Sequence, residues 1–264
     1  MHVIRKEYLF VAGCCAVFFL LACLTWRLDP VISRDGVKYL EWIDIWYRNG
    51  KFQAIFDIYP YFWVPPFYLW IVKILISIGI PPEFAARGVN LFCGMMTPWI
   101  AYLIAQEVQN DKRVSLAAAA LMALHPFMIE LAIEVQRDMI YLALCGWCIY
   151  FCLRGIKRQE IWPWIPAGFF ISCSILTRFE TMEMIPLVFA AFLLAGFCKY
   201  THWKRIAIQF IVLLGAFSVF FVSLLYVMGV SDHLLNYYQN YYSDKFKQSQ
   251  SLYLEYELGT VIKK

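Results

Sequence analysis

Long apolar stretches recur along the whole chain, and they constrain its fold more than any other feature. A helix needs about 20 consecutive apolar residues to cross the hydrocarbon core of a bilayer. Eight stretches approach that length: residues 8–26, 64–80, 88–105, 116–135, 139–153, 162–176, 184–198 and 206–230. The chain is 62% hydrophobic and 16% charged, whereas a soluble domain is roughly 45–50% apolar. Because one soluble core could not bury so much apolar surface, the sequence predicts an all-α polytopic membrane protein.

The basic residues indicate which stretches cross the membrane, since Lys and Arg concentrate in cytoplasmic loops. The basic segments are residues 5–6, 111–113, 154–158 and 199–205. All four can face the cytoplasm only if one apolar stretch between the first two segments does not cross. Residues 64–80 fit that role, because they open with Pro65–Pro66 and carry Lys73 in their middle. These features favour an interfacial or re-entrant helix. About seven transmembrane helices remain, with a cytoplasmic N-terminus.

This topology places residues 27–63 on the outer face, as a loop longer than a simple connector. Its apolar residues at helical spacing predict an amphipathic helix in the headgroup region, with one face made of Tyr39, Ile43, Trp46 and Tyr47. Asn49–Gly50 is typical of a helix end. Residues 1–230 are therefore predicted to form one transmembrane module. Residues 231–264 are predicted to be an extracytoplasmic amphipathic tail or the start of a further part of the protein.

Charged residues near membrane depth are costly and tend to be functional. Asp35 stands at the start of the predicted amphipathic helix, close to Lys38 and Tyr39. A carboxylate at the lipid–water boundary can act as a general base. Asp is also a favoured N-cap residue. The two roles are compatible, and the sequence leaves both open.

Two short outer loops carry further charges. Glu134 and Asp138 are four residues apart, so a continuous helix would place both carboxylates on one face, where they repel unless a cation or a metal lies between them. Arg137 is adjacent in the sequence. Arg178 stands on the outer side against the positive-inside bias. This arginine predicts either an anionic ligand, since a guanidinium suits phosphate, or a structural pair with Asp138 or Glu134.

The order of these segments resembles a known family. The stretches that carry the resemblance are Ser33-Arg-Asp-Gly, Val64-Pro-Pro-Phe, Ala86-Arg-Gly-Val-Asn, Leu124-His-Pro-Phe, Glu134-Val-Gln-Arg-Asp and Leu176-Thr-Arg-Phe-Glu. In this order the chain resembles the GT-C membrane glycosyltransferases of the protein O-mannosyltransferase and aminoarabinose-transferase type. Relatives often have a charged residue or a histidine where this chain has Val64. The module of that family also has seven spans, with surface helices between the first two.

The resemblance implies transfer of a sugar from a polyprenyl-phosphate donor to a lipid, glycan or protein acceptor on the extracytoplasmic side of the cell (inner) membrane. It makes Asp35 the catalytic base. It assigns the phosphate and sugar of the donor to Lys38, Tyr39, Arg137, Asp138 and Arg178. The residues expected to support the acceptor or the site are Glu134, Glu180, Tyr59 and Tyr61.

Two other functions remain open at this point. A non-catalytic or truncated membrane relative, acting as a subunit, would keep the fold, and Val64 favours it. A transporter or flippase is disfavoured, because transporters usually show repeated halves and broken helices at the midplane, whereas these charges gather at one face. The expected partners are membrane lipids and the two substrates, and no basic stretch indicates nucleic acid. No cofactor is predicted with certainty. A divalent metal stays open, although no residues have metal-ligand spacing.

Overall fold

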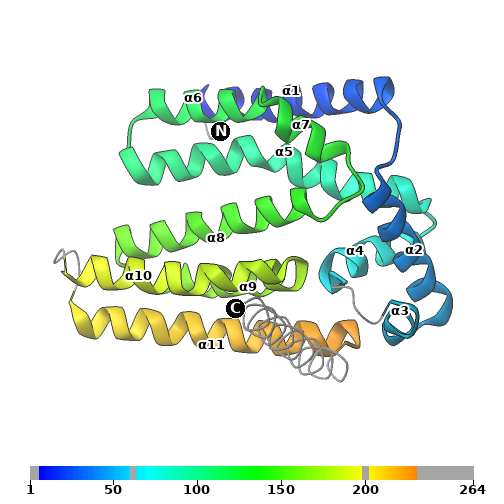
Figure 1. Ribbon diagram of the computed structural model, residues 1–264. Helices are drawn as coiled ribbons and strands as arrows, with labels where there is room; N and C mark the ends of the chain where they lie inside the picture. The colour runs from blue at the N-terminus through cyan, green and yellow to red at the C-terminus, as the bar shows by residue number, and fades with distance from the viewer. Residues whose placement is uncertain (1–5, 60–63, 198–201, 231–264) are drawn as a thin grey trace, which may run out of the picture.

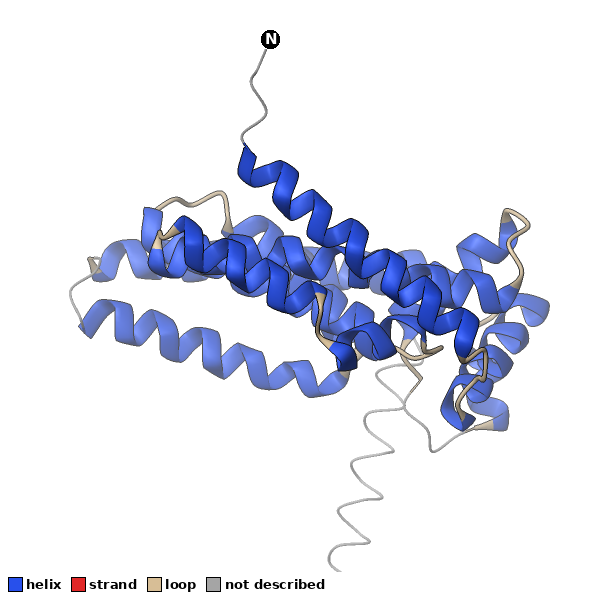
Figure 2. Ribbon diagram, turned by 90° about the horizontal axis from the view of Figure 1, so that it is seen from above, coloured by secondary structure: helices blue, strands red, loops and turns tan. Residues whose placement is uncertain are grey.

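The computed structural model describes residues 6–59, 64–197 and 202–230, and these residues form helices joined by short connections (Figure 1). The helices are α1 (Lys6–Leu28), α2 (Arg34–Asn49), α3 (Gln53–Ile58), α4 (Pro66–Ser77), α5 (Pro82–Gln109), α6 (Lys112–Ala123), α7 (Pro126–Ile133), α8 (Asp138–Arg158), α9 (Trp164–Thr177), the 3-10 turn η1 (Phe179–Glu183), α10 (Met184–Phe197) and α11 (Trp203–Met228). No strand occurs in these ranges, as Figure 2 shows. The predicted all-α fold class is confirmed. Tyr61 and the predicted tail, residues 231–264, lie outside the described residues.

The long helices lie side by side as a bundle (Figure 1). Helix α5 contacts α1, α6 and α8, and α9 in turn contacts α8 and α11. The three helices α2, α3 and α4 gather at one end of this bundle. We call them the platform, and we call the end of the bundle beside them the platform end.

Within the described residues, four helices are individually long and apolar enough to cross a membrane, namely α1, α5, α8 and α11. The predicted stretch 116–135 is instead two helices, α6 and α7, bent by 52° at His125–Pro126, and the pair counts as a fifth span if it crosses as one unit. The proline explains the break, because it removes a backbone donor and clashes with the preceding turn. Helices α9 and α10 have 14 residues each, fewer than a straight span needs. The chain is a polytopic membrane protein, and the count of seven spans stays a prediction.

Helix α4 is short for a span. Its 12 residues extend about 18 Å at 1.5 Å per residue, well below the roughly 30 Å of a hydrocarbon core. Its buried side chains Phe67, Tyr68, Leu69 and Val72 join an apolar core shared with α2, α3, α5, α9 and α11. The platform is thereby fixed to the bundle by apolar packing. The interfacial position proposed for residues 64–80 remains a prediction.

Helix α2 has well-defined ends. The Ser33 hydroxyl oxygen accepts a hydrogen bond from the Gly36 N–H at 3.2 Å, which is the usual N-cap bond. Gly50 ends the helix in the left-handed region, with φ of 71°, and its N–H donates to the Trp46 carbonyl. The predicted helix end at Asn49–Gly50 is confirmed. Of the predicted face, Ile43 and Trp46 are buried together with Trp42, while Tyr47 is 46% exposed, and the headgroup position of this face stays a prediction.

Candidate active site at the platform end

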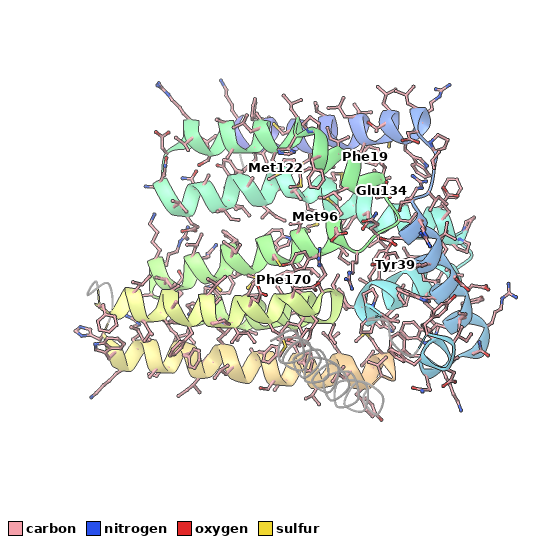
Figure 3. The ribbon with its side chains drawn as sticks, viewed as in Figure 1. Phe19, Tyr39, Met96, Met122, Glu134 and Phe170 are labelled. Carbon is pink, nitrogen blue, oxygen red and sulfur yellow. The ribbon has the colours of Figure 1, made fainter. Side chains whose placement is uncertain are left out.

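Three segments that are distant in the sequence bring charged and phenolic side chains together beside the platform. They are the first turns of α2, the connection from α7 into α8, and the turn that follows α9. Figure 3 shows Tyr39 at this end of the molecule, with Glu134 nearby. We call the group the polar cluster; its members, all predicted from the sequence, are Asp35, Lys38, Tyr39, Arg137, Asp138, Arg178 and Glu180.

Tyr39 connects the three segments. Burial is the main cause that raises the pKa of its phenol, and the negative charges of Asp138 and Asp35 raise this pKa as well. The positive charges of Arg137 and, more weakly, Arg178 lower it. The phenol is therefore within electrostatic reach of charges from all three segments. Its ring packs edge-on against Trp42 and Tyr68, with centroids 5.3 and 5.8 Å away. The apolar platform thus holds this hydroxyl in place as a neutral donor and acceptor.

Arg178 forms the central ion pair of the cluster. It pairs with Asp138 at the first turn of α8 and, at 3.5 Å, with Glu180. Its guanidinium also lies 5.3 Å from the centre of the Tyr141 ring. The predicted pair of Arg178 with Asp138 is present. Because the side chains of Arg178 and Asp138 remain 31% and 26% exposed, the pair can still be reached by a ligand.

The two partners of this network influence each other's ionisation. Burial alone would lower the pKa of Arg178, but the carboxylates of Asp138 and Glu180 raise it. Burial alone would raise the pKa of the Glu180 carboxyl, but its own backbone N–H and the guanidiniums of Arg178 and Arg137 hold it below its ordinary value. Arg178 therefore stays cationic and Glu180 stays anionic at neutral pH.

The turn after α9 is held by a buried threonine. The Thr181 hydroxyl, fully buried, donates toward the Ser174 carbonyl at 3.0 Å and the Arg178 carbonyl at 2.6 Å. The Arg178 N–H donates to the Ser174 carbonyl at 2.7 Å, which closes the last turn of α9. The helix end is thereby satisfied internally, and the Arg178 side chain is directed toward Asp138 at the start of α8.

Arg137 adds a cation that lacks a carboxylate partner. Among the described residues it makes no ion pair within 4.0 Å, and its buried Nη1 has no hydrogen-bond acceptor there. The buried Nε of Arg178 likewise donates to no acceptor in the described part of the chain. Buried N–H groups normally have partners. The cluster consequently holds cationic donors beyond those that its own acids use.

Asp35 lies at the exposed edge of the cluster. Ser33 is the N-cap of α2, so the alternative in which Asp35 caps this helix is wrong. Asp35 is instead in the first turn, where its side chain is 71% exposed and lies 4.0 Å from the Lys38 ammonium. A carboxylate in a first helical turn is stabilised by the helix dipole. The carboxylate can therefore be reached from outside the protein.

Sequence reasoning gave no role to Arg87 and Asn90, which stand three residues apart on α5. Both are fully buried. Arg87 donates to the carbonyls of Ile133, Pro30 and Val31, at 2.8, 2.9 and 3.3 Å, and pairs with Glu83. The sequence signal that could have identified these two residues is an arginine and an asparagine at helical spacing inside an apolar helix.

Asn90 and Gln136 extend the same network to the loop between α7 and α8. The Asn90 amide donates to the carbonyls of Glu134 and Gln136 at 2.6 and 2.7 Å. The Gln136 side chain donates to the Ser33 hydroxyl at 3.3 Å. A Cβ at Gly36 would lie 3.1 Å from the Val135 Cβ. The loop before Asp138 is therefore packed directly against the helix turn that carries Asp35.

Two predicted residues, Glu134 and Tyr59, border the cluster without joining its ion pairs. Helix α7 ends at Ile133 and α8 begins at Asp138, so no continuous helix places the Glu134 and Asp138 carboxylates on one face. Glu134 instead lines a separate cavity of about 350 Å³ with Asp29 and Glu130. Tyr59 packs against Trp42 and hydrogen-bonds Glu41, an interaction that raises the pKa of its phenol.

Two further features limit what the cluster can bind. Val64 is fully buried in the apolar core, so it offers no polar contact to a donor. Within the described ranges, no three His, Cys, Asp or Glu side chains are placed to hold a metal ion. The cationic side chains of the polar cluster are those of Lys38, Arg137 and Arg178.

A helical membrane bundle with this polar cluster at one end is the arrangement expected of a GT-C membrane glycosyltransferase. Comparison with known families gives a match over residues 64–226 to a model described as dolichyl-phosphate-mannose-protein mannosyltransferase. Because the match covers more than half of the chain, the protein belongs to this family of GT-C type glycosyltransferases. No curated protein matches the chain. The matched range includes Arg137, Asp138 and Arg178, whereas Asp35 precedes it.

Proposed function

We propose that the chain transfers a sugar from a polyprenyl-phosphate donor to a hydroxyl acceptor on the extracytoplasmic side of the membrane, with the polar cluster as its active site. The observation that carries the proposal is the convergence of Asp35, Arg137 and Arg178 around Tyr39 from three separate segments. Family membership supports the reaction class. The donor, the acceptor, the side of the membrane and the roles of single residues belong to the proposal.

The chemistry assigns different tasks to the acid and the cations. The acceptor oxygen forms a bond to the anomeric carbon, while the bond from that carbon to the phosphate oxygen breaks and its electrons leave with the lipid phosphate. Asp35 takes the proton of the acceptor hydroxyl, as a general base. Arg137, Arg178 and Lys38 stabilise the negative charge that grows on the leaving phosphate. One base is sufficient if the anomeric configuration inverts.

The ion pair of Arg178 with Asp138 prepares the cation for this task. A guanidinium fixed before the reaction needs no reorganisation as charge develops on the phosphate. Asp138 and Glu180 hold Arg178 in place, while its Nε has no acceptor in the described residues. Arg137 offers its Nη1 in the same region. These N–H groups are the ones we assign to the phosphate oxygens.

Sugar transfer by the purified full chain in detergent tests the proposal. The donors are polyprenyl phosphates that carry a hexose or a pentose, and the acceptors are a panel of lipids, glycans and peptides. Transfer with at least one pair is expected. Asp35→Asn should reduce the rate about 10²–10⁴-fold, the usual contribution of a general base, without a change in donor binding.

Asp44→Asn is the matched control, because Asp44 lies on the same helix and pairs with Arg48 at 2.8 Å, outside the cluster. This variant should transfer at the unmodified rate. Equal activity of the Asp35→Asn variant and the unmodified chain would remove Asp35 from the proposal. Donor binding without transfer for every acceptor would favour the non-catalytic subunit, to which the buried Val64 also points.

A further inference from the structure

A second cavity lies at the platform end, away from the polar cluster. It has a volume of about 550 Å³ and lies between the end of α2, the start of α3, α4 and the end of α11. Figure 1 shows these four elements meeting at one end of the bundle. The residues that line the cavity are Trp46, Gly50, Lys51, Phe52, Gln53, Trp70, Lys73, Tyr226, Val227, Met228 and Gly229. None of these residues belongs to the polar cluster.

Among the described residues, the lining carries two ammonium groups and no acid. Lys51 and Lys73 are the charged residues of the cavity, and among the described residues neither has a carboxylate within 4.0 Å. Lys73 is half-buried, with its ammonium 4.6 Å from the centre of the Trp46 ring. Burial lowers the pKa of Lys73, as expected for a cation without a nearby anion.

The ends of two helices oppose this positive charge only in part. Both α2 and α11 end beside the cavity, at Gly50 and Gly229. A helix C-terminus is equivalent to about half a negative charge, and some of its carbonyls are satisfied by the cap. The N–H groups of Gly50 and Gly229 each close their own helix. Two full ammonium charges therefore dominate the electrostatics of the cavity.

The surroundings of the cavity are those of a lipid-facing surface. On α11, Tyr226 is 81% exposed and Val227 is 61% exposed, and on α4, Ile74 is 42% exposed. Helix α11 buries little of its apolar surface within the protein. Trp and Tyr are enriched at the level of lipid headgroups, and Trp46, Trp70 and Tyr226 all line this cavity. An anion that reaches the two lysines would then approach from the headgroup layer.

We propose that this cavity binds the phosphate of an anionic membrane phospholipid, with Lys51 and Lys73 as its ligands and the exposed side of α11 as the surface along which the acyl chains lie. The site shares no described residue with the donor site proposed above, because the polar cluster gathers around Tyr39, whose ring packs on Trp42 and Tyr68, whereas Trp46, Trp70 and the end of α11 line this cavity. Its occupant would fasten the platform to the bilayer beside the active site.

Titration of the full chain in detergent with phosphatidylglycerol, read by native mass spectrometry, tests this site. The unmodified chain is expected to bind one such lipid more tightly than phosphatidylcholine. Each lysine near a lipid phosphate contributes enough for about a fivefold change in affinity. Lys51→Gln together with Lys73→Gln should therefore weaken phosphatidylglycerol binding about 30-fold, and Lys51→Arg together with Lys73→Arg should retain it.

Lys204→Gln is the matched control, since Lys204 is exposed at the other end of α11 and carries the same charge. Unchanged phosphatidylglycerol binding in the double glutamine variant would overturn the proposal. Competition by inorganic phosphate at equal concentration would overturn the assignment to a lipid. A parallel loss of polyprenyl-phosphate binding in that variant would assign the cavity to the donor instead. Sugar transfer is measured separately, so failure of the proposed reaction does not affect this result.

Discussion

At the end of the bundle opposite the platform, two ion pairs connect neighbouring helices. Glu107 of α5, 5% exposed, pairs with Arg158 at the end of α8, and Lys112 of α6 pairs with Glu7 of α1. At the platform end the polar cluster has acids and cations as well, but Arg137 has no carboxylate partner among the described residues. The first arrangement joins helix ends, whereas in the second the buried Nη1 of Arg137 and Nε of Arg178 have no acceptor among the described residues.

The difference predicts that charged residues at the two ends have different roles. A buried charge is tolerated when a partner compensates it, and Arg158 does so for Glu107. Unmatched charges are costly near a membrane and mark functional positions. The two ends can therefore be distinguished by matched substitutions, which should affect stability at one end and sugar transfer at the other.

Among the substitutions that compare the two ends, Arg178→Gln has the largest expected effect. The substitution removes the cation assigned to the leaving phosphate and leaves Asp138 unpaired, so kcat/KM for sugar transfer should fall about 10²–10³-fold, the usual cost of one charge-stabilising donor. Arg158→Gln is the matched change at the opposite end, and it should lower the thermal midpoint while the folded fraction keeps its transfer rate. Equal losses of transfer in the two variants would remove the functional distinction between the ends.

A second change should affect both stability and transfer. Asn90→Leu removes the donor to two backbone carbonyls of the loop before Asp138, and each unsatisfied buried group costs about 1–3 kcal/mol. We expect a lower thermal midpoint and slower transfer, because this loop positions Arg137 and Asp138. Thr97→Val on the same helix is the control, since that hydroxyl donates only to the Gly94 carbonyl of its own helix. Normal transfer by the Asn90→Leu variant would contradict the positioning role.

Gly36→Ala tests the packing of α2 on the loop. The new Cβ would lie 2.7 Å from the Ile32 Cγ2, and crowding of this kind costs about 1–3 kcal/mol. The start of α2 should shift, and Asp35 with it, so that transfer falls more than donor binding. Gly13→Ala on α1 meets nothing within 4 Å, so its effect on the thermal midpoint should be neutral or slightly favourable. The same fall in transfer for both variants would contradict the inference that packing at Gly36 positions Asp35.

The sequence predicted the helical membrane fold because hydrophobicity is a local property that can be read along the chain. It also predicted Asp35, Asp138 and Arg178, because charges stand out in an apolar sequence. Their proximity could not be predicted from local patterns, since α2 and the turn after α9 meet only through the arrangement of the bundle.

The supporting residues could not be predicted in the same way. Arg87 and Asn90 act on backbone carbonyls more than forty positions away, and no local pattern shows where a remote carbonyl will lie. The cap of α2 was missed for a different reason. Ser33 and Asp35 are both favoured capping residues, and only the observed hydrogen bond from Gly36 selects the serine. Local rules thus predicted the elements, while long-range hydrogen bonds determine how the site is held.

The smallest expected effect concerns the acid dependence of stability at the platform end. The pKa of Glu180 is held below its ordinary value, in part by Arg178 and Arg137, even though burial opposes the shift. A lowered folded-state pKa contributes stability above the ordinary pKa, and this contribution is lost as the pH falls through the folded value. The thermal midpoint should therefore decline below about pH 4.5, and Glu180→Gln should remove part of that decline. Because the side chain is 53% exposed, the contribution is below about 1 kcal/mol. Glu183→Gln is the control, because Glu183 is exposed in the same turn. This variant should retain the acid response of the unmodified chain. A similar response in both variants would show that the arginines do not lower the pKa of Glu180.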